Sequence, residues 1–150
     1  MSTQGDVVMQ TTSPSAGSGS ATVDAAWGAQ DSNVRVKLGE PPGQLASYYA
    51  LVAGRYQDFD NYYFVTIRAD NKLGLVKRYQ GNVTDLIAPV NISPAEWHSV
   101  RLLIVESTIV VYLDGAMRAS VLDSALTTSG IALGSNGIAA SFDDVFALRP

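Results

Sequence analysis

The clearest structural signal in the sequence is the segment 61–76, which reads NYYFVTIRADNKLGLV. Within it, Tyr63, Val65 and Ile67 occupy every second position, and this period of two is typical of a strand with one buried face. The polar triplet 70–72 separates this run from a second apolar run, and residues of this kind tolerate the backbone conformations of hairpin turns. The segment therefore predicts an antiparallel hairpin, with strands at 61–70 and 73–80.

The same period of two recurs on both sides of this hairpin. Val34, Val36 and Leu38 alternate with Arg35 and Lys37, and residues 109–114 follow the same pattern. A single helical turn is predicted at 93–96, where a proline follows a capping serine. Many short strands with frequent turns predict an all-β chain folded as an antiparallel sandwich or barrel. The predicted strands are 6–12, 20–28, 32–39, 47–56, 61–70, 73–80, 82–88, 97–106, 108–114, 116–122, 130–134 and 140–149.

Composition restricts both the architecture and the partners. The chain has 150 residues, a net charge of -4, 47% apolar and 16% charged residues, and no cysteine. These values predict one domain over 1–150, of which 1–20 is partly flexible because 11–20 is small and polar. The acidic balance argues against a nucleic-acid partner, and the lack of cysteine excludes disulfides and thiolate metal sites. We recognise no signal peptide and no membrane-inserting segment in the chain.

Three groups of residues together resemble a known family. They are 55–63 with 75–81, 97–102 with 109–115, and 130–134 with 141–145. In this order and spacing they resemble the concanavalin A-like (laminin G-like) jelly-roll domains that are appended to bacterial and phage carbohydrate-active proteins. The resemblance covers residues 20–150 and implies a two-sheet antiparallel β-sandwich of jelly-roll topology. This fold carries lectins, enzymes, adhesion modules and virion proteins, so it does not define one function.

The start of the chain departs from the family pattern. Such domains usually begin with an extra strand that has an acidic-aromatic start, whereas the first apolar run here lies within 6–12. Either residues 1–10 supply this strand in another form, or the strand is missing. A missing strand would leave an open sheet edge beside the last strand. Such an edge predicts strand exchange or self-association, because its backbone groups need a partner.

The sequence offers few groups for catalysis. Glycosidases need two carboxylates at a fixed separation, and the glucanases of this fold carry Glu-x-Asp-x-x-Glu on one strand. None of the three glutamates stands in such a motif, and a single histidine, His98, occurs without a Gly-x-Ser-x-Gly elbow. We therefore predict that the chain is not an enzyme. A glycoside hydrolase-related domain that uses Asp58 and Asp60 is the alternative.

Calcium is the one cofactor that the residue types allow. Asp143 and Asp144 are adjacent, and a second acidic cluster contains Asp58, Asp60 and Asn61. Carboxylate and amide oxygens are the ligands that Ca²⁺ prefers. The alternative is that these side chains bind the backbone of their own turns or cap a loop. A structural calcium ion at Asp143 and Asp144 is the resulting hypothesis.

Carbohydrate binding is the function that the pattern favours most. Sugar sites stack aromatic rings on the sugar and fix its hydroxyl groups with polar side chains, and five of the seven tyrosines lie within 48–63. Alternation assigns Tyr62, Phe64, Thr66 and Arg68 to a solvated face. The alternative is that the tyrosines simply cover the surface of the sheet. The predicted ligand-binding residues, expected to converge on one surface, are Arg55, Tyr56, Asp58, Asn61, Tyr62, Arg68, Lys77, Tyr79 and Tyr112.

These observations lead to one hypothesis and two alternatives. We predict a non-catalytic module for carbohydrate binding or surface recognition, with a glycan or polysaccharide as its partner. Its predicted setting is extracellular or virion-associated, within a larger protein. The first alternative is a structural or assembly module of a virion or of a modular surface protein. The second is a glycoside hydrolase-related domain.

Overall fold

The computed structural model describes residues 2–5, 9–11, 20–23, 29–39, 47–94, 97–127 and 130–148. Within these ranges all regular structure is β-strand, arranged in two antiparallel sheets that form a sandwich. The all-β prediction is therefore confirmed. No helix in the described ranges has the length and apolar character needed to cross a membrane.

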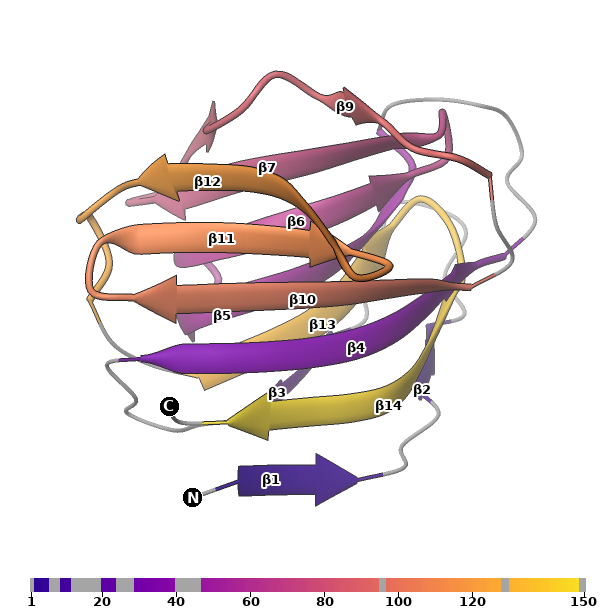
Figure 1. The fold of residues 1–150 in the computed structure, drawn as a ribbon, viewed down its shortest axis with the longest axis horizontal. Helices are drawn as coiled ribbons and strands as arrows, with labels where there is room; N and C mark the ends of the chain where they lie inside the picture. Colours follow the sequence, from indigo (N-terminus) through magenta and orange to yellow (C-terminus); the bar gives the residue numbers. More distant parts are fainter. Residues whose placement is uncertain are drawn as a thin grey trace.

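Sheet A forms one layer of the sandwich. Its strand order is β1-β14-β4-β10-β11-β12, and β2 also pairs with β14 (Figure 1). The last strand, β14, thus lies between β4 and the two N-terminal strands. The bounds are β1 (Ser2–Gly5), β2 (Met9–Thr11), β4 (Gln30–Leu38), β10 (His98–Val105), β11 (Thr108–Leu113), β12 (Ala116–Leu122) and β14 (Ala140–Leu148).

Sheet B forms the second layer, which lies behind sheet A in Figure 1. Its strand order is β3-β13-β5-β6-β7-β8, and β9 pairs with β7. The hairpin predicted from segment 61–76 is the pair β6–β7, in which Val65 lies opposite Leu75. The bounds are β3 (Ser20–Val23), β5 (Tyr49–Asp58), β6 (Asn61–Arg68), β7 (Lys72–Tyr79), β8 (Asn82–Asp85), β9 (Val90–Asn91) and β13 (Gly130–Asn136).

The main core lies between the two sheets. In β10 and β11 alternate residues point inward, and in β10 these are Val100, Leu102 and Ile104, which are fully buried. Tyr63 and Phe142 are the largest apolar side chains in this core, and both are completely buried. Burying one such side chain contributes roughly 1.5–3 kcal/mol. The apolar residues that recur with a period of two in the sequence are therefore the ones that face this core.

The open edge predicted beside the last strand does not exist. Ser2 to Gly5 pair with β14 in register with Leu148 to Val145, and Met9 to Thr11 pair with the other end of the same strand. Residues within 2–11 thus supply the extra strand in another form, as two short pieces. The hypothesis of strand exchange through an edge left open at β14 is therefore wrong, because backbone partners already occupy that edge.

Some predicted boundaries also differ. The strand predicted at 82–88 ends at Asp85, and a separate two-residue strand follows at Val90–Asn91. The predicted strand 20–28 is observed at Ser20–Val23, and its remainder lies outside the described residues. The loop expected at 11–20 and the helical turn at 93–96 lie partly outside them as well.

Candidate functional site

The outward face of sheet B carries a second apolar cluster. The strand register aligns Ala132, Ala53, Phe64 and Val76 in one row across β13, β5, β6 and β7. Tyr62 lies beside this row, and the exposed fractions of Tyr62 and Phe64 are only 7% and 5%. The prediction that these positions form a solvated face is therefore wrong, because the aromatic side chains of neighbouring strands cover one another.

A line of aromatic rings crosses this face. The ring centres of Tyr56 and Tyr62 are 5.2 Å apart, those of Tyr62 and Phe64 are 5.1 Å apart, and those of Phe64 and Tyr49 are 6.4 Å apart. Such spacings are favourable for aromatic pairs. Burial raises the pKa of both the Tyr49 and the Tyr62 hydroxyl, although the nearby Arg78 charge acts in the opposite direction. These four rings are thus mostly buried. They form a rigid base for the residues at either end of the line.

One end of this line continues into an exposed ring at the β5–β6 turn. Phe59 is 61% exposed, and the Arg78 guanidinium carbon lies 4.3 Å from its ring centre. Arg78 Nη2 also contacts Asp60 Oδ1 at 3.3 Å. The register of β6 and β7 places Arg78 directly opposite Tyr62. We call the five residues Tyr56, Phe59, Asp60, Tyr62 and Arg78 the Phe59 cluster.

Two predicted site residues hold the turn beneath this cluster. Asp58 Oδ1 accepts hydrogen bonds from the Asp60 amide (2.8 Å) and from Asn61 Nδ2 (3.0 Å). Asn61 Oδ1 accepts one from the Gln80 amide at 2.9 Å. The bond from the Asp60 amide is a contact with the backbone of its own turn, which is the alternative given above to calcium binding by this cluster. Asp58 and Asn61 therefore position Phe59 and Asp60, and one carboxylate oxygen of Asp58 is already occupied.

One donor of Arg78 is enclosed by the protein. Its Nε is buried and has no hydrogen-bond partner among the described residues. A guanidinium carries five N–H donors in a planar fork. The group therefore combines a stacking surface for Phe59 with an ion pair to Asp60, while its Nε faces the protein interior.

Arg55 does not join the cluster. It lies at a bulge of β5 with a φ of 47° and is only 2% exposed. Its amide donates to Gln30 Oε1 at 2.6 Å, and its Nη1 donates to the Leu126 carbonyl at 2.8 Å. Burial lowers the pKa of the Arg55 guanidinium. The expected convergence of Arg55 with the exposed aromatic residues is wrong, because the bulge turns its side chain into the end of the sandwich.

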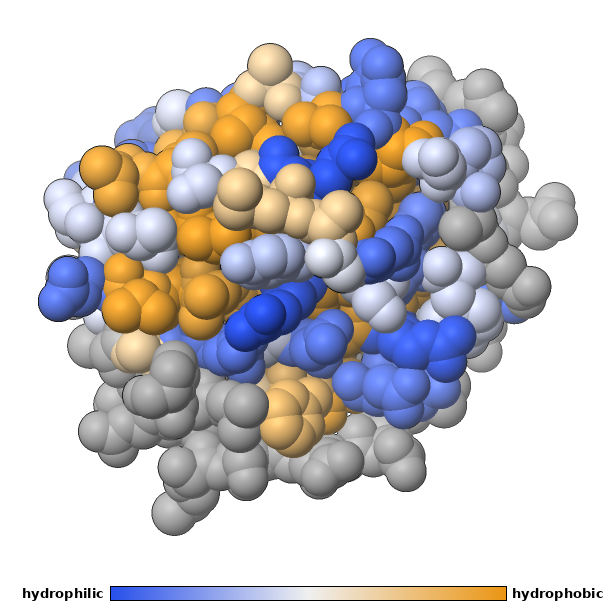
Figure 2. Space-filling model, viewed as in Figure 1, coloured by the Kyte–Doolittle hydropathy of each residue, from blue (hydrophilic) through white to orange (hydrophobic). Residues whose placement is uncertain are grey.

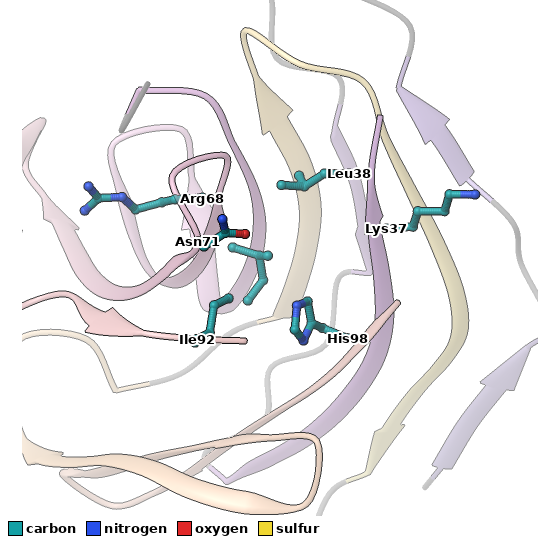
Figure 3. Close-up of a pocket in the computed structure, with 7 residues that line it drawn as sticks. Lys37, Leu38, Arg68, Asn71, Ile92 and His98 are labelled. Atoms are coloured by element: carbon teal, nitrogen blue, oxygen red, sulfur yellow. The ribbon is translucent and has the colours of Figure 1, made fainter. Parts of the chain in front are cut away.

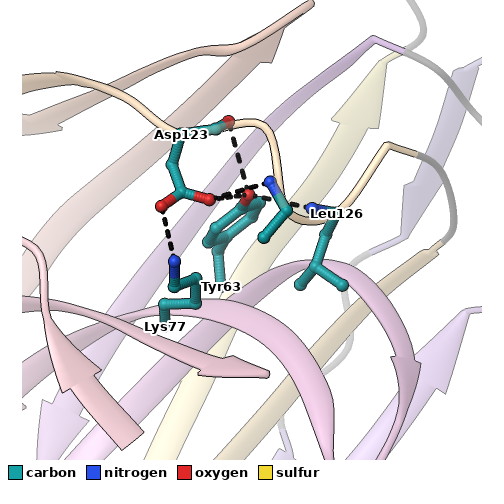
Figure 4. Close-up of polar contacts among 5 residues, drawn as sticks. Tyr63, Lys77, Asp123 and Leu126 are labelled. Carbon is teal, nitrogen blue, oxygen red and sulfur yellow. Dashed lines mark hydrogen bonds and ion pairs between the residues drawn. The ribbon is translucent and has the colours of Figure 1, made fainter. Parts of the chain in front are cut away.

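Lys77 also points to the inner side of sheet B. It lies opposite Tyr63, and its Nζ donates to Asp123 Oδ2 at 2.7 Å (Figure 4). The Tyr63 hydroxyl donates to Asp123 Oδ1 at 2.6 Å and accepts from the Leu126 amide at 3.1 Å. This network fastens the segment that follows β12 to sheet B. The expectation that Lys77 shares a surface with Tyr62 is therefore wrong.

The ionisation of this network follows from its geometry. Burial, together with the hydrogen bond to Asp123, raises the pKa of Tyr63 to about 12. Burial alone would raise the pKa of Asp123, but hydrogen bonds from Lys77, Tyr63 and the Ala125 amide hold it below its usual value. The network therefore contains a neutral phenol and a charged Lys77–Asp123 pair.

The remaining predicted ligand residues are dispersed. Arg68 makes a bidentate pair with Asp70, with contacts of 2.9 and 2.6 Å, at the far end of β6 from Phe59. Tyr79 is 37% exposed and follows Arg78, so it points to the other side of β7. Tyr112 lies on sheet A, 5.1 Å from the Arg101 guanidinium. Of the nine predicted residues, the structure brings Tyr56, Asp58, Asn61 and Tyr62 to one place.

The predicted calcium residues lie at a bulge in β14. Asp143 Oδ1 accepts a hydrogen bond from the Asp144 amide at 2.8 Å, and Asp144 has a φ of 48°. Arg35 Nη1 lies 3.6 Å from Asp144 Oδ2. Within the described residues, no three acidic or histidine side chains gather in a way that could hold a metal ion. Calcium binding at Asp143 and Asp144 stays a prediction.

A small pocket opens beside His98 at one end of the sandwich (Figure 3). Its volume is about 110 Å³, which is well below the roughly 300 Å³ at which ligand pockets begin. His98 Nδ1 is paired with Asp114 Oδ2 at 2.8 Å. Figure 3 shows the charged ends of Lys37 and Arg68 pointing away from the pocket. The pocket therefore offers little to a sugar.

The outward face of sheet A is different in character. Figure 2 shows hydrophobic residues gathered over the ends of β10, β11 and β12. Val105 and Leu122 belong to these strand ends and are 41% and 77% exposed. The other part of this face carries Arg35, whose guanidinium carbon lies 4.9 Å from the ring centre of Trp97. Exposed apolar residues and a stacked arginine thus also occur on sheet A, where they can be substituted as controls for the Phe59 cluster.

Comparison with known proteins identifies structures that share this architecture. No family model and no curated protein matches the sequence. Among solved structures, the chain is similar to the carbohydrate-binding module CBM66 from Bacillus subtilis, with a TM-score of 0.73, 15% identity, and coverage of 96% of this chain and 92% of that one. The fold is a concanavalin A-like β-sandwich.

Other solved structures share the sandwich. Sheep galectin-11 matches with a TM-score of 0.62 and 11% identity over 85% of this chain and 96% of its own. The β-fructofuranosidase of Aspergillus kawachii matches with a TM-score of 0.70 and 11% identity over all of this chain. This chain spans only 27% of that enzyme. At these identities the concanavalin A-like fold is what the likenesses establish.

Proposed function

We propose that this chain binds a carbohydrate at the Phe59 cluster and does not cleave it. The observation that carries the proposal is the exposed Phe59 ring with the Arg78 guanidinium stacked 4.3 Å from its centre. Sugar recognition combines an aromatic surface for the CH groups with donors and acceptors for the hydroxyl groups. Phe59 supplies the first, and Arg78 and Asp60 supply the second.

The surroundings of the cluster support this proposal. Tyr56 and Tyr62 form its base, and Tyr62 is held by rings on both sides. A preformed site of this kind loses little conformational entropy when a ligand binds. The fold likeness to a carbohydrate-binding module and to a galectin is in keeping with the same function.

The geometry of the acidic residues favours binding over hydrolysis. A glycosidase needs two carboxyl groups that flank the scissile bond. Asp58 and Asp60 are the acidic pair at this site, and Asp58 Oδ1 accepts two hydrogen bonds within the turn. Asp60 is paired with Arg78. Both carboxylates thus already have structural partners within the protein, which favours a positioning role in the turn over a pair that flanks a scissile bond.

Affinity electrophoresis tests the proposal. The protein migrates through native gels that contain inulin, laminarin or galactomannan, and retardation reports binding. We expect retardation by at least one of these polysaccharides, and we expect Phe59→Ala to abolish it. Leu122→Ala is the control, because it removes a large apolar side chain that is also more than half exposed, from sheet A.

Two results would overturn the proposal. One is normal migration in every polysaccharide gel, and the other is unchanged retardation of Phe59→Ala. Self-association detected by ultracentrifugation, together with no glycan binding, would instead favour the assembly-module alternative. An extracellular or virion-associated setting, a single domain over 1–150 and the absence of a nucleic-acid partner stay predictions.

A further inference from the structure

We infer that the Phe59 cluster selects uncharged sugars and disfavours acidic ones such as uronates. This inference rests on the proposed function and concerns the class of glycan that the site accepts. It follows from the charges that surround Arg78 on the outward face of sheet B.

The single cation of the cluster is already neutralised. Arg78 Nη2 lies 3.3 Å from Asp60 Oδ1, and the side chain of Asp60 is 58% exposed. A sugar carboxylate that approached the guanidinium would therefore meet the Asp60 carboxylate beside it. Like charges in contact reduce affinity, and charge patterns of this kind act mainly on specificity.

Two further carboxylates surround the same spot. Asp58 is exposed in the same turn as Phe59. Asp85 of β8 lies opposite Val76, which shares the outward face with Arg78 two positions away. Among the described residues, this turn and the adjacent outward positions of β7 and β8 thus carry one cation, Arg78, and three carboxylates. The formal charge of the whole chain, -4, has the same sign.

The other described cations on this face lie at the opposite end of the strands. Arg68 is six positions from Tyr62 along β6 and is held by Asp70. At roughly 3.3 Å per residue, this places it about 20 Å from the cluster, which is more than a Debye length of about 8 Å at physiological salt. Arg68 therefore does not offset the acidic surroundings of Arg78.

The experiment compares neutral and acidic polysaccharides at the same site. Native gels contain either the neutral polysaccharide that retards the wild-type protein or polygalacturonate, each at low and at high NaCl. We expect retardation by the neutral polysaccharide to be insensitive to salt and polygalacturonate to give none. Asp60→Asn removes the neutralising charge, so we expect polygalacturonate to retard this variant in low-salt gels, in which it does not retard the wild type, and we expect high salt to abolish that retardation.

The outcomes separate this inference from the proposed function. If wild-type protein prefers polygalacturonate, and Phe59→Ala loses that binding, the site binds sugar and the inference about charge is overturned. If Asp60→Asn gains no affinity for polygalacturonate, the role of Asp60 is overturned. If neither class of polysaccharide binds, the proposed function itself fails. Asp143→Asn is the matched control, because it removes the same charge from sheet A.

Discussion

The guanidinium of Arg78 stacks on the ring of Phe59 at 4.3 Å, although the two residues come from different hairpins of sheet B. Phe59 lies in the β5–β6 turn, and Arg78 lies near the end of β7. Because Arg78 also faces Tyr62 in the register and pairs with Asp60, one side chain connects the exposed ring to the buried aromatic line. The site therefore depends on Arg78 for its shape as well as for its donors.

Replacing Arg78 tests this dependence. We expect Arg78→Ala to weaken glycan binding at least about tenfold, which corresponds to about 1.4 kcal/mol, because it removes both the donors and the support of the Phe59 ring. The measurement is affinity electrophoresis or calorimetric titration with the polysaccharide that binds the wild type. Arg35→Ala is the control, since it removes the same kind of stacked guanidinium from Trp97 on sheet A. Equal loss in both variants would argue against a site at Arg78.

The second prediction concerns the contribution of the Tyr63 hydroxyl to the stability of the protein. Tyr63→Phe removes the donor to Asp123 and leaves the buried Leu126 amide without its acceptor. An unsatisfied buried group costs about 1–3 kcal/mol, so we expect the free energy of unfolding to fall by that amount. Urea denaturation measures it, and Tyr112→Phe on the surface of sheet A is the control. Glycan binding should persist, because Tyr63 faces away from the Phe59 cluster. If Tyr63→Phe is as stable as the wild type, the hydrogen bonds among Tyr63, Asp123 and Leu126 do not stabilise the fold.

The third prediction concerns how the contribution of the same hydroxyl to stability changes at alkaline pH. The pKa of Tyr63 is raised from 10.0 to about 12 in the folded protein, chiefly by burial. A raised folded-state pKa means that the neutral hydroxyl contributes its full stability below pH 10 and loses that contribution as the pH rises from 10 to about 12. We therefore expect the stability difference between the wild type and Tyr63→Phe to shrink over this range. Denaturation curves at several pH values measure it, and a difference that stays constant from pH 9 to 12 would contradict the assignment.

Local pattern was sufficient to predict the strands but not their partners. The alternation in segment 61–76 identified β6 and β7, and the inward set Tyr63, Val65 and Ile67 is in the core. The same alternation misassigned Tyr62 and Phe64, which are covered in part by the rings of Tyr56 and Tyr49 on the neighbouring strand β5. A pattern within one strand contains no information on such lateral contacts.

The candidate site shows the same limit. Lys77 looked like a surface cation, but its partner Asp123 lies 46 residues away, and only the tertiary fold brings the two together. Arg55 was predicted within strand 47–56 to join the exposed ligand residues, but a bulge turns its side chain away from them. The sequence signal for Phe59 was present and was missed: a large apolar ring lies between Asp58 and Asp60 in the predicted loop, and only the fold shows that Arg78 stacks on it.

Gly137 makes the last prediction, on the corner between β13 and β14. Its φ is 69°, and a Cβ atom placed there would overlap the ring of Tyr48. Gly115 is the matched control, because its φ is 85° but nothing lies within 4 Å of the place where its Cβ would be. Gly115→Ala should therefore cost only the backbone strain, about 1–2 kcal/mol. Gly137→Ala should cost about 1–3 kcal/mol more, because the Tyr48 ring must move.

The carbonyl of Tyr48 accepts a hydrogen bond from the Ala69 amide at 2.8 Å, so that movement would also disturb the end of β6. Chemical denaturation of both variants measures the difference, and equal stabilities would show that the Tyr48 ring moves aside without cost.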